Sequence, residues 1–368
     1  MATGHPRGVS AVVTRRSLPL LRPPEASLPP LQARWIVAVL GTPTLPDESN
    51  ATCDDCAMLA DPSLPPGALV FSPDTRCCTY LPTLANFLVG GALREATSHG
   101  AASMRLRLAK NDGVSALGII VDPALVAATQ SDTERFGRDV TLRCPHYEPT
   151  TGRCGVWAWR EATCATWFCK HTRGERAKAF WNRLQQLLAR LERAVAWHCA
   201  LTLDLPPEAF ALLSPLARTN GPGRADVLAG EVDPWGRWSG DVEGFFRACT
   251  EVAEALTPAA VLALGGVEAL ALAQTVQLAH RQLLDDALPT QVTLGRAQVV
   301  GLSPDSVRTQ GYSHLDPLEV PRALFDQLHH FDGRPLDDAL RAASAAAGED
   351  VPAGAIGMLL DFGILRGC

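Results

Sequence analysis

The chain has little excess charge and few aromatic residues. Its 368 residues carry a net charge of −6, with 20% charged and 6% aromatic residues. Acidic residues outnumber basic ones, so no overall positive field would draw the chain to nucleic acid or to anionic lipid. With 47% apolar residues, however, the chain can bury a core. We therefore expect a globular protein with no nucleic-acid partner.

Long uninterrupted apolar runs are also lacking. The most apolar helical segment, residues 259–288, is interrupted by Glu268, His280 and Arg281, whereas a membrane span needs about 20 predominantly apolar residues. Near the N-terminus, two arginines precede an apolar run that is too short and too broken for a signal peptide. These features predict no membrane partner and a cytoplasmic, reducing location.

A phosphate-binding glycine loop is missing as well. Gly265 and Gly266 lie inside a helical pattern and lack the spacing of such a loop. No catalytic constellation is apparent in the helical part of the chain. The sequence therefore leaves open whether the protein is an enzyme.

Hydrophobic periodicity predicts a mainly α protein of the α+β class. Residues 1–50 are Pro-rich, with an apolar run at 35–40 that is typical of a strand. Residues 51–200 are predicted to form an irregular cysteine-cluster domain that ends in a long helix. Within it we expect short helices at 84–93 and 101–108 and short strands at 117–121 and 140–143.

The second half of the chain is predicted to form a helical domain, residues 206–303, and a C-terminal unit, residues 315–368. The helical domain should contain helices at 207–216, 241–256 and 258–288 and one strand at 291–302. The C-terminal unit should contain helices at 321–330, 335–347 and 353–362, with a turn at 331–333.

The clearest predicted helix follows the last clustered cysteine. Thr172 and Glu175 match a capping box. A stripe of apolar residues then recurs with a 3.6-residue period over six turns. Its members are Ala177, Phe180, Trp181, Leu184, Leu187, Leu188, Leu191, Ala194, Val195 and His198. We expect this stripe to pack on the core beside the cysteines.

The C-terminal unit carries Phe331-Asp332-Gly333 and Gly363-Ile364-Leu365. This pattern resembles the small winged-helix modules found in peptide-modifying proteins. Four arginines face nine acidic residues in 315–368, which gives a net charge of −5. Because a duplex-binding surface needs positive charge, we predict a protein or peptide partner for this unit and no DNA.

Eight of the 11 cysteines lie between residues 53 and 169. They are Cys53, Cys56, Cys77, Cys78, Cys144, Cys154, Cys164 and Cys169. In a reducing compartment, clustered cysteines indicate metal or redox chemistry more than disulfides, although disulfides remain an alternative. A Cys-x2-Cys step brings two sulfurs to one ion. The adjacent pair Cys77-Cys78 more naturally serves two metals or one bridged centre.

Other side chains near the cluster are weaker candidates. His146 and His171 each lie two residues after a cysteine, so either could replace a thiolate as ligand. Cys199 and Cys249 lie on predicted helix faces and should be buried packing residues, and Cys368 is terminal. We predict that these three cysteines are dispensable for metal binding.

The segment CPHYEPTTGRCGVWAWREATCATWFC, residues 144–169, resembles the second half of the YkgJ-type cysteine-cluster family. Cys53-x2-Cys56 together with Cys77-Cys78 resembles the first half, although 20 residues separate Cys56 from Cys77. Arg160 is followed by Glu161, where the family has Arg-Pro. The resemblance implies chelation of zinc or iron by the eight cysteines. A broader similarity is to the flagellin lysine methylases that carry such a cluster.

Three functions are consistent with these patterns. The first is a protein that binds iron or an iron–sulfur cluster and performs redox chemistry or modifies a protein or peptide. The second is an enzyme like the lysine N-methylases, although no loop for a methyl donor is apparent. The third is a non-catalytic binding module in which zinc holds the loops together.

Overall fold

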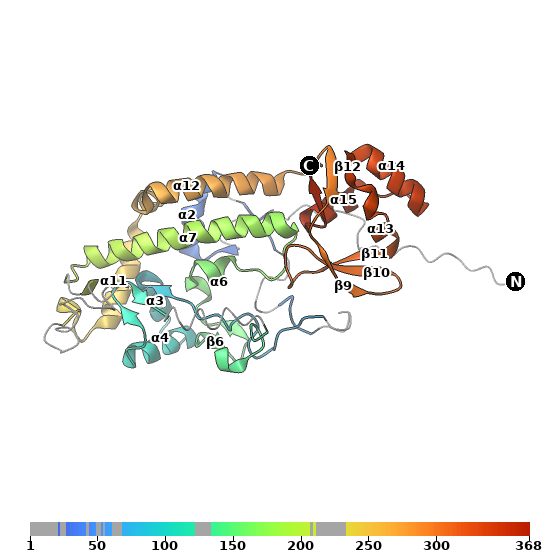
Figure 1. The fold of residues 1–368 in the computed structure, drawn as a ribbon. Coiled ribbons are helices and arrows are strands. Elements are labelled where there is room, and N and C mark those ends of the chain that lie inside the picture. Colours follow the sequence, from blue (N-terminus) through green and yellow to red (C-terminus); the bar gives the residue numbers. More distant parts are fainter. Residues whose placement is uncertain are drawn as a thin grey trace, which may run out of the picture.

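The computed structural model describes residues 21–22, 27–41, 44–48, 53, 56–60, 68–121, 134–206, 209–210 and 233–368. Helices predominate and the strands form small sheets, so the coarse prediction of a mainly α protein of mixed α+β type is confirmed (Figure 1). The helices are α2 (Pro30–Leu40), α3 (Asn86–Arg94), α4 (His99–Ala109), α6 (Ala162–Thr166), α7 (Gly174–Thr202), α11 (Val242–Ala255), α12 (Pro258–Leu284), α13 (Arg322–Phe325), α14 (Leu336–Ala347) and α15 (Ala353–Asp361).

The strands are short. They are β1 (Leu21–Arg22), β2 (Leu45–Pro46), β3 (Leu84–Ala85), β4 (Val114–Ser115), β5 (Gly118–Ile119), β6 (Tyr147–Glu148), β7 (Arg153–Cys154), β8 (Gln291–Leu294), β9 (Gln298–Leu302), β10 (Ser306–Gln310), β11 (Leu318–Pro321), β12 (Asp332–Pro335) and β13 (Leu365–Gly367). Four single-turn 3₁₀ helices are also described: η1 (Val140–Leu142), η2 (Trp157–Trp159), η3 (Gly236–Trp238) and η4 (Leu328–His330).

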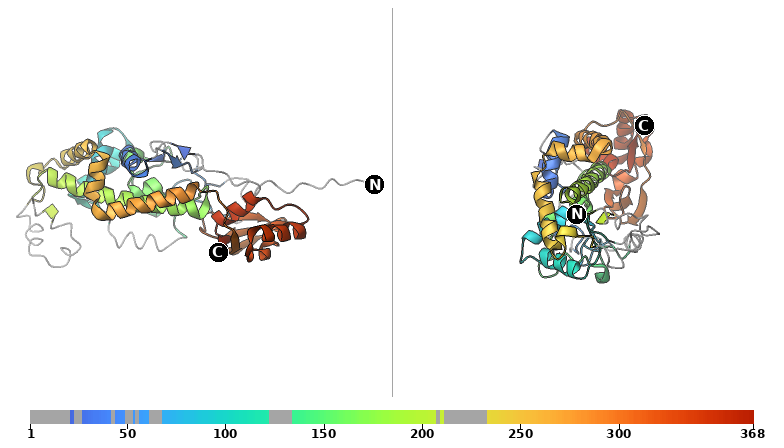
Figure 2. Two further views of the ribbon diagram at one scale, coloured as in Figure 1. Left: turned by 90° about the horizontal axis from the view of Figure 1, so that it is seen from above. Right: turned by 90° about the vertical axis from the view of Figure 1, so that its left-hand side faces the viewer.

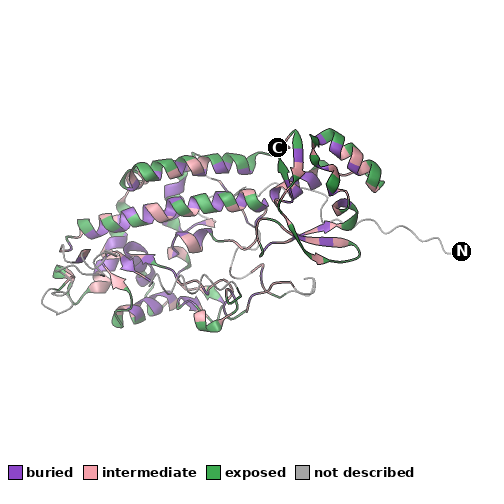
Figure 3. Ribbon diagram, viewed as in Figure 1, coloured by how far each residue is buried: buried purple, intermediate pink, exposed green. Residues whose placement is uncertain are grey.

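Helix α7 forms the spine of the main core. It runs beside α12, and α2 packs against α12 (Figures 1 and 2). Gln32 of α2 also donates to Glu192 of α7. The predicted stripe from Ala177 to Val195 is buried, whereas His198 is only partly buried. Buried residues follow one side of α7 and exposed residues the other (Figure 3). The main apolar stabilisation of the protein therefore comes from this helical layer.

The predicted capping box at the start of α7 is wrong. The helix begins at Gly174, and Arg173 precedes it without a side-chain cap. Tertiary contacts take the polar groups of Thr172 instead: its N–H donates to Glu48, and its hydroxyl donates to the Asp47 carbonyl. Local capping was overridden by packing against the segment that follows α2.

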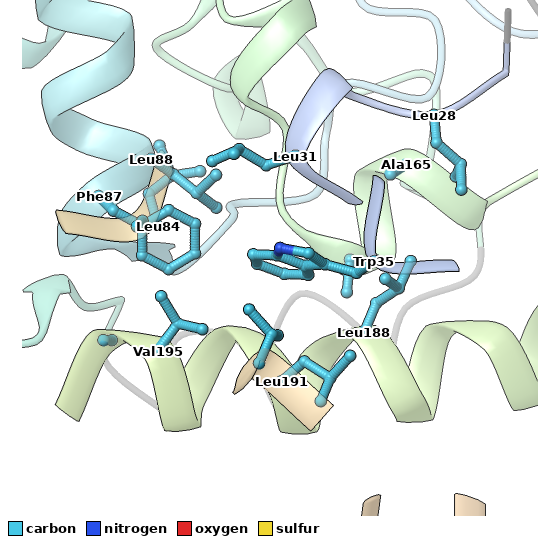
Figure 4. Packing of buried hydrophobic residues seen from close by; sticks show 14 of the residues in the cluster. Leu28, Leu31, Trp35, Leu84, Phe87, Leu88, Ala165, Leu188, Leu191 and Val195 are labelled. Atoms are coloured by element: carbon cyan, nitrogen blue, oxygen red, sulfur yellow. The ribbon is translucent and has the colours of Figure 1, made fainter. Parts of the chain in front are cut away.

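The strand predicted at 35–40 is also wrong, because these residues belong to helix α2. Proline begins this helix, where its missing N–H costs nothing. Leu31, Trp35 and Val39 recur with a spacing of four and are buried. The Trp35 indole lies between residues of α3 and of α7 (Figure 4).

Of the short elements predicted near the cysteines, three are confirmed and one is wrong. Helices α3 and α4 confirm the predictions at 84–93 and 101–108, and β5 lies within the strand predicted at 117–121. The strand predicted at 140–143 is wrong: these residues form η1, because the Asp139 side chain accepts the Thr141 N–H and closes a turn. The helix predicted at 207–216 lies outside the described residues, apart from Ala209 and Phe210.

Residues 291–368 form a second core at one end of the molecule (Figure 2). One sheet has the order β11-β10-β9 and another the order β12-β8-β13. The single strand predicted at 291–302 is therefore two strands in different sheets. By its hydrogen bonds, β8 belongs with β12 and β13, not with the helices that precede it. Asp332 and Gly333, predicted to turn, begin β12.

Helices α11 and α12 confirm the predictions at 241–256 and 258–288, although α12 ends at Leu284. Helix α12 is long and apolar enough to cross a membrane, judged by length and composition alone, and 28% of its most apolar window is buried. It is also bent, because Gly266 adopts a left-handed φ of 70°. One side of α12 packs on α7 and α2.

Candidate metal centre

The eight clustered cysteines come from separate loops that meet beside α6. Cys77 and Cys78 lie in a turn, Cys154 ends β7, Cys164 lies on α6, and Cys169 precedes α7. Each of the eight thiols interacts electrostatically with at least one other thiol of the set, and this interaction raises the pKa of one of the two. Segments that are more than 100 residues apart in sequence therefore bring their sulfurs into one neighbourhood.

One part of this neighbourhood is apolar. Met58, Phe71 and Leu315 form a small buried cluster, and three cysteines pack against it: Cys56, Cys77 and Cys169. Leu315 belongs to the loop between β10 and β11, so the C-terminal unit supplies one wall of the cysteine site. Sequence reasoning missed this residue, because nothing near Leu315 in sequence signals a contact with cysteines that are 146 or more positions away (315 − 169 = 146).

The loop that carries Leu315 is tied down beside Cys169. The Asp316 carboxylate accepts the His171 N–H at 3.1 Å and also accepts the Tyr312 hydroxyl. Lys178 of α7 donates to the Tyr312 carbonyl at 3.2 Å. Burial raises the pKa of Asp316. These bonds fix the C-terminal unit against the start of α7.

A second part of the neighbourhood is built on backbone hydrogen bonds. The Cys144 N–H donates to the Cys78 carbonyl at 2.7 Å. Tyr147 pairs with Cys154 across the β6–β7 hairpin. Cys164 lies at the start of α6, where the Glu161 carboxylate caps the helix and accepts the Cys164 N–H at 2.8 Å. The cap orients the turn that presents the Cys164 thiol.

Backbone amides donate to several of the sulfurs. Cys56 receives the N–H of Met58, and Cys144 receives that of His146. The Leu59 and Tyr147 N–H groups donate instead to the carbonyls of the same two cysteines. The Val156 N–H donates to the Cys154 sulfur. Each of these bonds to sulfur favours the thiolate and lowers the pKa of the thiol. Amides aimed at sulfur are one of the features by which proteins tune metal-bound cysteines.

Burial nevertheless keeps most of these thiols protonated when they are free. It raises the pKa of Cys53 to about 11 and that of Cys144 to about 12. Cys77 is the exception: a hydrogen bond from the Cys78 thiol lowers the pKa of Cys77 to about 7. A free cysteine in most of these positions is therefore a poor nucleophile at neutral pH.

A buried arginine lies among the thiols. Arg160 is only 8% exposed. Its guanidinium stacks on Trp157 at 3.4 Å and donates to the carbonyls of Trp157 and Cys164. Within the described ranges no carboxylate pairs with it. The groups that would offset the lowering of the Arg160 pKa by burial are four thiols, and they do so only when ionised: Cys154, Cys164, Cys53 and Cys77.

The two candidate histidines have different surroundings. His146 is fully buried, and its Nδ1 lies 2.8 Å from the Ser103 hydroxyl. Ser103 gives its single proton to the Gly100 carbonyl, so His146 Nδ1 must be the donor. Its Nε2 is then unprotonated and carries a lone pair. This nitrogen has no hydrogen-bond partner among the described residues. His171 instead contacts the Tyr312 hydroxyl through Nδ1 at 3.3 Å.

The remaining cysteines lie elsewhere. Cys199 and Cys249 are buried in the helical core, where the Cys199 thiol donates to the Cys249 carbonyl at 3.3 Å, and Cys368 is exposed. All 11 cysteines are in the described part of the chain, and all are free thiols.

The thiols do not close on an ion in this conformation. Among the described residues, no three His, Cys, Asp or Glu side chains are placed to hold one metal. Metal binding would therefore require the thiols to move toward one another. The chemistry of the donors fits iron or zinc, both of which take four thiolates.

A cavity of about 550 Å³ reaches the edge of the cysteine cluster. Cys53 and Cys154 line it, together with His99, Glu95 and Trp157. Cys53 and Cys154 are half-buried at the edge of this cavity, whereas Cys56, Cys77 and Cys169 pack against the apolar cluster that contains Leu315.

No protein-family model matches the chain, and no curated protein or solved structure is significantly similar to it. The resemblance to the YkgJ-type family therefore stays a prediction that rests on the cysteine motifs.

Proposed function

We propose that the chain is a metal-binding cysteine-cluster protein of the YkgJ type, and that it holds iron, as ions or as an iron–sulfur cluster, in preference to zinc. The proposed ligands are the eight clustered cysteines. A cytoplasmic location suits a protein whose thiols must stay reduced.

Arg160 is the observation that carries the proposal. A buried cation is costly unless an anion compensates it. Because burial raises the pKa of most neighbouring thiols, these thiols would be neutral and could not compensate Arg160. A metal ion changes this, because cysteine binds metal as the thiolate. Loading with metal therefore gives Arg160 the negative charge that its position requires.

Two further features favour a reactive iron centre over structural zinc. The cluster has more thiols than one tetrahedral zinc ion takes. A structural zinc site is also closed, whereas Cys53 and Cys154 line a cavity. We therefore propose a redox role or a role in modifying a protein or peptide.

The test is purification of the full chain without oxygen, followed by visible absorption, metal analysis and acid-labile sulfide analysis. We expect a brown protein with iron that is lost in Cys77→Ala and kept in the matched control Cys249→Ala. A colourless protein with stoichiometric zinc would support the alternative of a structural binding module. A chain without metal would contradict the proposal altogether.

The winged-helix-like C-terminal unit is proposed to bind a protein or peptide. Its net charge of −5 over 315–368 opposes a DNA backbone. In a gel-shift experiment at low salt, the full chain should not retard a DNA duplex. Tight, salt-sensitive retardation would contradict this proposal.

A further inference from the structure

Helix α12 is apolar on both of its sides. Its inner side packs on α7 and α2 and buries residues such as Ala269 and Val276. Its outer side presents Val267, which is 83% exposed, and Leu270 and Leu278, which are 51% and 50% exposed. The helix lies at the outside of the helical layer (Figures 1 and 3). Because a helix that is apolar all round is normally buried, the outer side of α12 calls for a cover that the described residues do not provide.

The exposed residues of α12 recur with the spacing of a seam between two helices. Five of them follow one another in alternating steps of four and three residues: Val267, Ala271, Gln274, Leu278 and Arg281. Residues so spaced lie on one face of an α-helix, and two helices can pack along such a face. All five lie after the bend of α12, so one continuous segment carries them. These five residues and Leu270 are called the outer stripe below.

The charges of α12 suit pairing with a second copy of the same helix. The helix has one acidic residue, Glu268, and one arginine, Arg281, near the two ends of the outer stripe. If two stripes pack antiparallel about a twofold axis near Gln274, Glu268 lies opposite the partner's Arg281. Leu278 then lies opposite the partner's Ala271. A parallel pair would instead set like charges against each other, which is unfavourable.

Both charged groups are accessible for such contacts. Arg281 is exposed, and its side chain has no hydrogen-bond or ion-pair partner in the part of the chain that the structure describes. Glu268 contacts Arg190 of α7 at 2.7 Å, but the Glu268 side chain is still 66% exposed. Its carboxylate can therefore accept a second guanidinium.

We infer that α12 is a self-association surface, through which two copies of the chain pair antiparallel about a twofold axis. Burial of the outer stripe drives the pairing, and the contacts between Glu268 and the partner's Arg281 set its direction. The same surface serves both copies, so the assembly closes as a dimer. The cysteine loops lie on the other side of α7 (Figures 1 and 2), so the pairing does not depend on metal.

Sedimentation velocity of the full chain over a range of concentrations tests the inference. A reducing buffer keeps the exposed Cys368 from linking two copies. The wild type should pass from monomer to dimer as concentration rises. Leu278→Glu places an uncompensated charge in the seam and should raise the dimer Kd by at least about tenfold. The matched control is Leu302→Glu on β9, where the side chain is 71% exposed, and it should leave the Kd unchanged.

Exchange of the two charges tests the direction of the pairing. Glu268→Arg alone and Arg281→Glu alone each bring like charges together at both ends of the seam, so each should raise the Kd by about tenfold or more. An equimolar mixture of the two variants should dimerise again, because opposite charges then meet at both ends. Recovery on mixing also shows that both variants are folded.

Three results would overturn the inference. They are a wild type that stays monomeric at every concentration, a dimer that Leu278→Glu leaves intact, and a mixture of the two charge variants that stays monomeric. Flotation with neutral phospholipid vesicles tests lipid as the cover instead. A monomeric wild type that floats with the vesicles, and a Leu278→Glu variant that does not, would assign the outer stripe to a membrane and refute self-association.

Discussion

The helical layer and the cysteine loops, defined as residues 53–80 and 134–170, are held together in different ways. The helical layer buries a long apolar stripe of α7 against α12, α2 and α3. The cysteine loops add Val156, Ala162 and Ala165 to the core of that layer. They also share a separate small cluster of three buried residues, Met58, Phe71 and Leu315, the last of which comes from the C-terminal unit. Eight side chains of the loops are thiols, of which Cys144 is buried and the other seven are half-buried. Most of the apolar burial therefore lies in the helices, and we propose that metal on the thiols holds the loops.

The largest effect is expected from damage to the helical layer. Phe180 is fully buried on α7, and Phe180→Ala should lower the free energy of unfolding by about 3–5 kcal/mol. Chemical denaturation followed by circular dichroism measures this loss. Arg183→Ala, on the exposed side of the same helix, should change the value by less than about 0.5 kcal/mol. Equal losses in the two variants would contradict the role given to the stripe.

A smaller and more local effect is expected at the wall shared by the cysteine loops and the C-terminal unit. Leu315→Ala should cost about 2–3 kcal/mol, at the lower end for a buried leucine, because the cluster is small. In metal-free protein it should also speed alkylation of Cys56, Cys77 and Cys169. Leu302→Ala on β9 is the control, since Leu302 is 71% exposed. If Leu315→Ala left all alkylation rates unchanged, Leu315 would not cover the site.

The smallest effect concerns pH and the join between the two regions. Glu192 of α7 accepts hydrogen bonds from Gln32 of α2 and from the Ala162 N–H at the start of α6. Burial, with the charge of Glu161, raises the pKa of Glu192 well above its usual range. The folded protein therefore holds a proton that the unfolded chain releases. Stability should fall as pH rises above the unfolded pKa of about 4.3, by at most about 1.4 kcal/mol per pH unit for this proton.

Glu192→Gln removes this titration, and its single carbonyl oxygen can accept one of the two bonds, from Gln32 or from the Ala162 N–H. The slope of unfolding free energy against pH should become flatter between the unfolded and the folded pKa of Glu192. The exposed Glu251 of α11 offers a control, because Glu251→Gln should leave the slope unchanged. A slope that is identical in wild type and Glu192→Gln would show that Glu192 does not bind this proton.

The same contrast explains what could be predicted from sequence. The stripe of α7 was readable because its burial follows one helical period, and α3, α4 and α11 were found in the same way. The strand predicted at 35–40 failed because a run of apolar residues fits a buried helix as well as a strand, and Trp35 packs between α3 and α7. The capping box at Thr172 failed because Glu48 and Asp47, distant in sequence, take its polar groups.

For the site, sequence reasoning named all eight clustered cysteines, and they do share one neighbourhood. It noted Arg160 only as part of the family motif, because its burial among thiols depends on tertiary structure. Leu315 could not be found at all. Which cysteines lie closest to one another is likewise a property of the folded loops, since residues 77 and 78 are adjacent in sequence and have different neighbours.

The central claim is that metal on the cysteines holds the loops, while apolar burial holds the helices. Hydrogen–deuterium exchange of the anaerobically purified chain, before and after chelation, tests it most directly. Removal of the metal should speed exchange in the peptides containing Met58, His146 and Val156, whose amides donate to sulfur, and should leave the interior of α7 protected. Unchanged exchange in these loop peptides, or equal loss of protection in α7, would contradict the account.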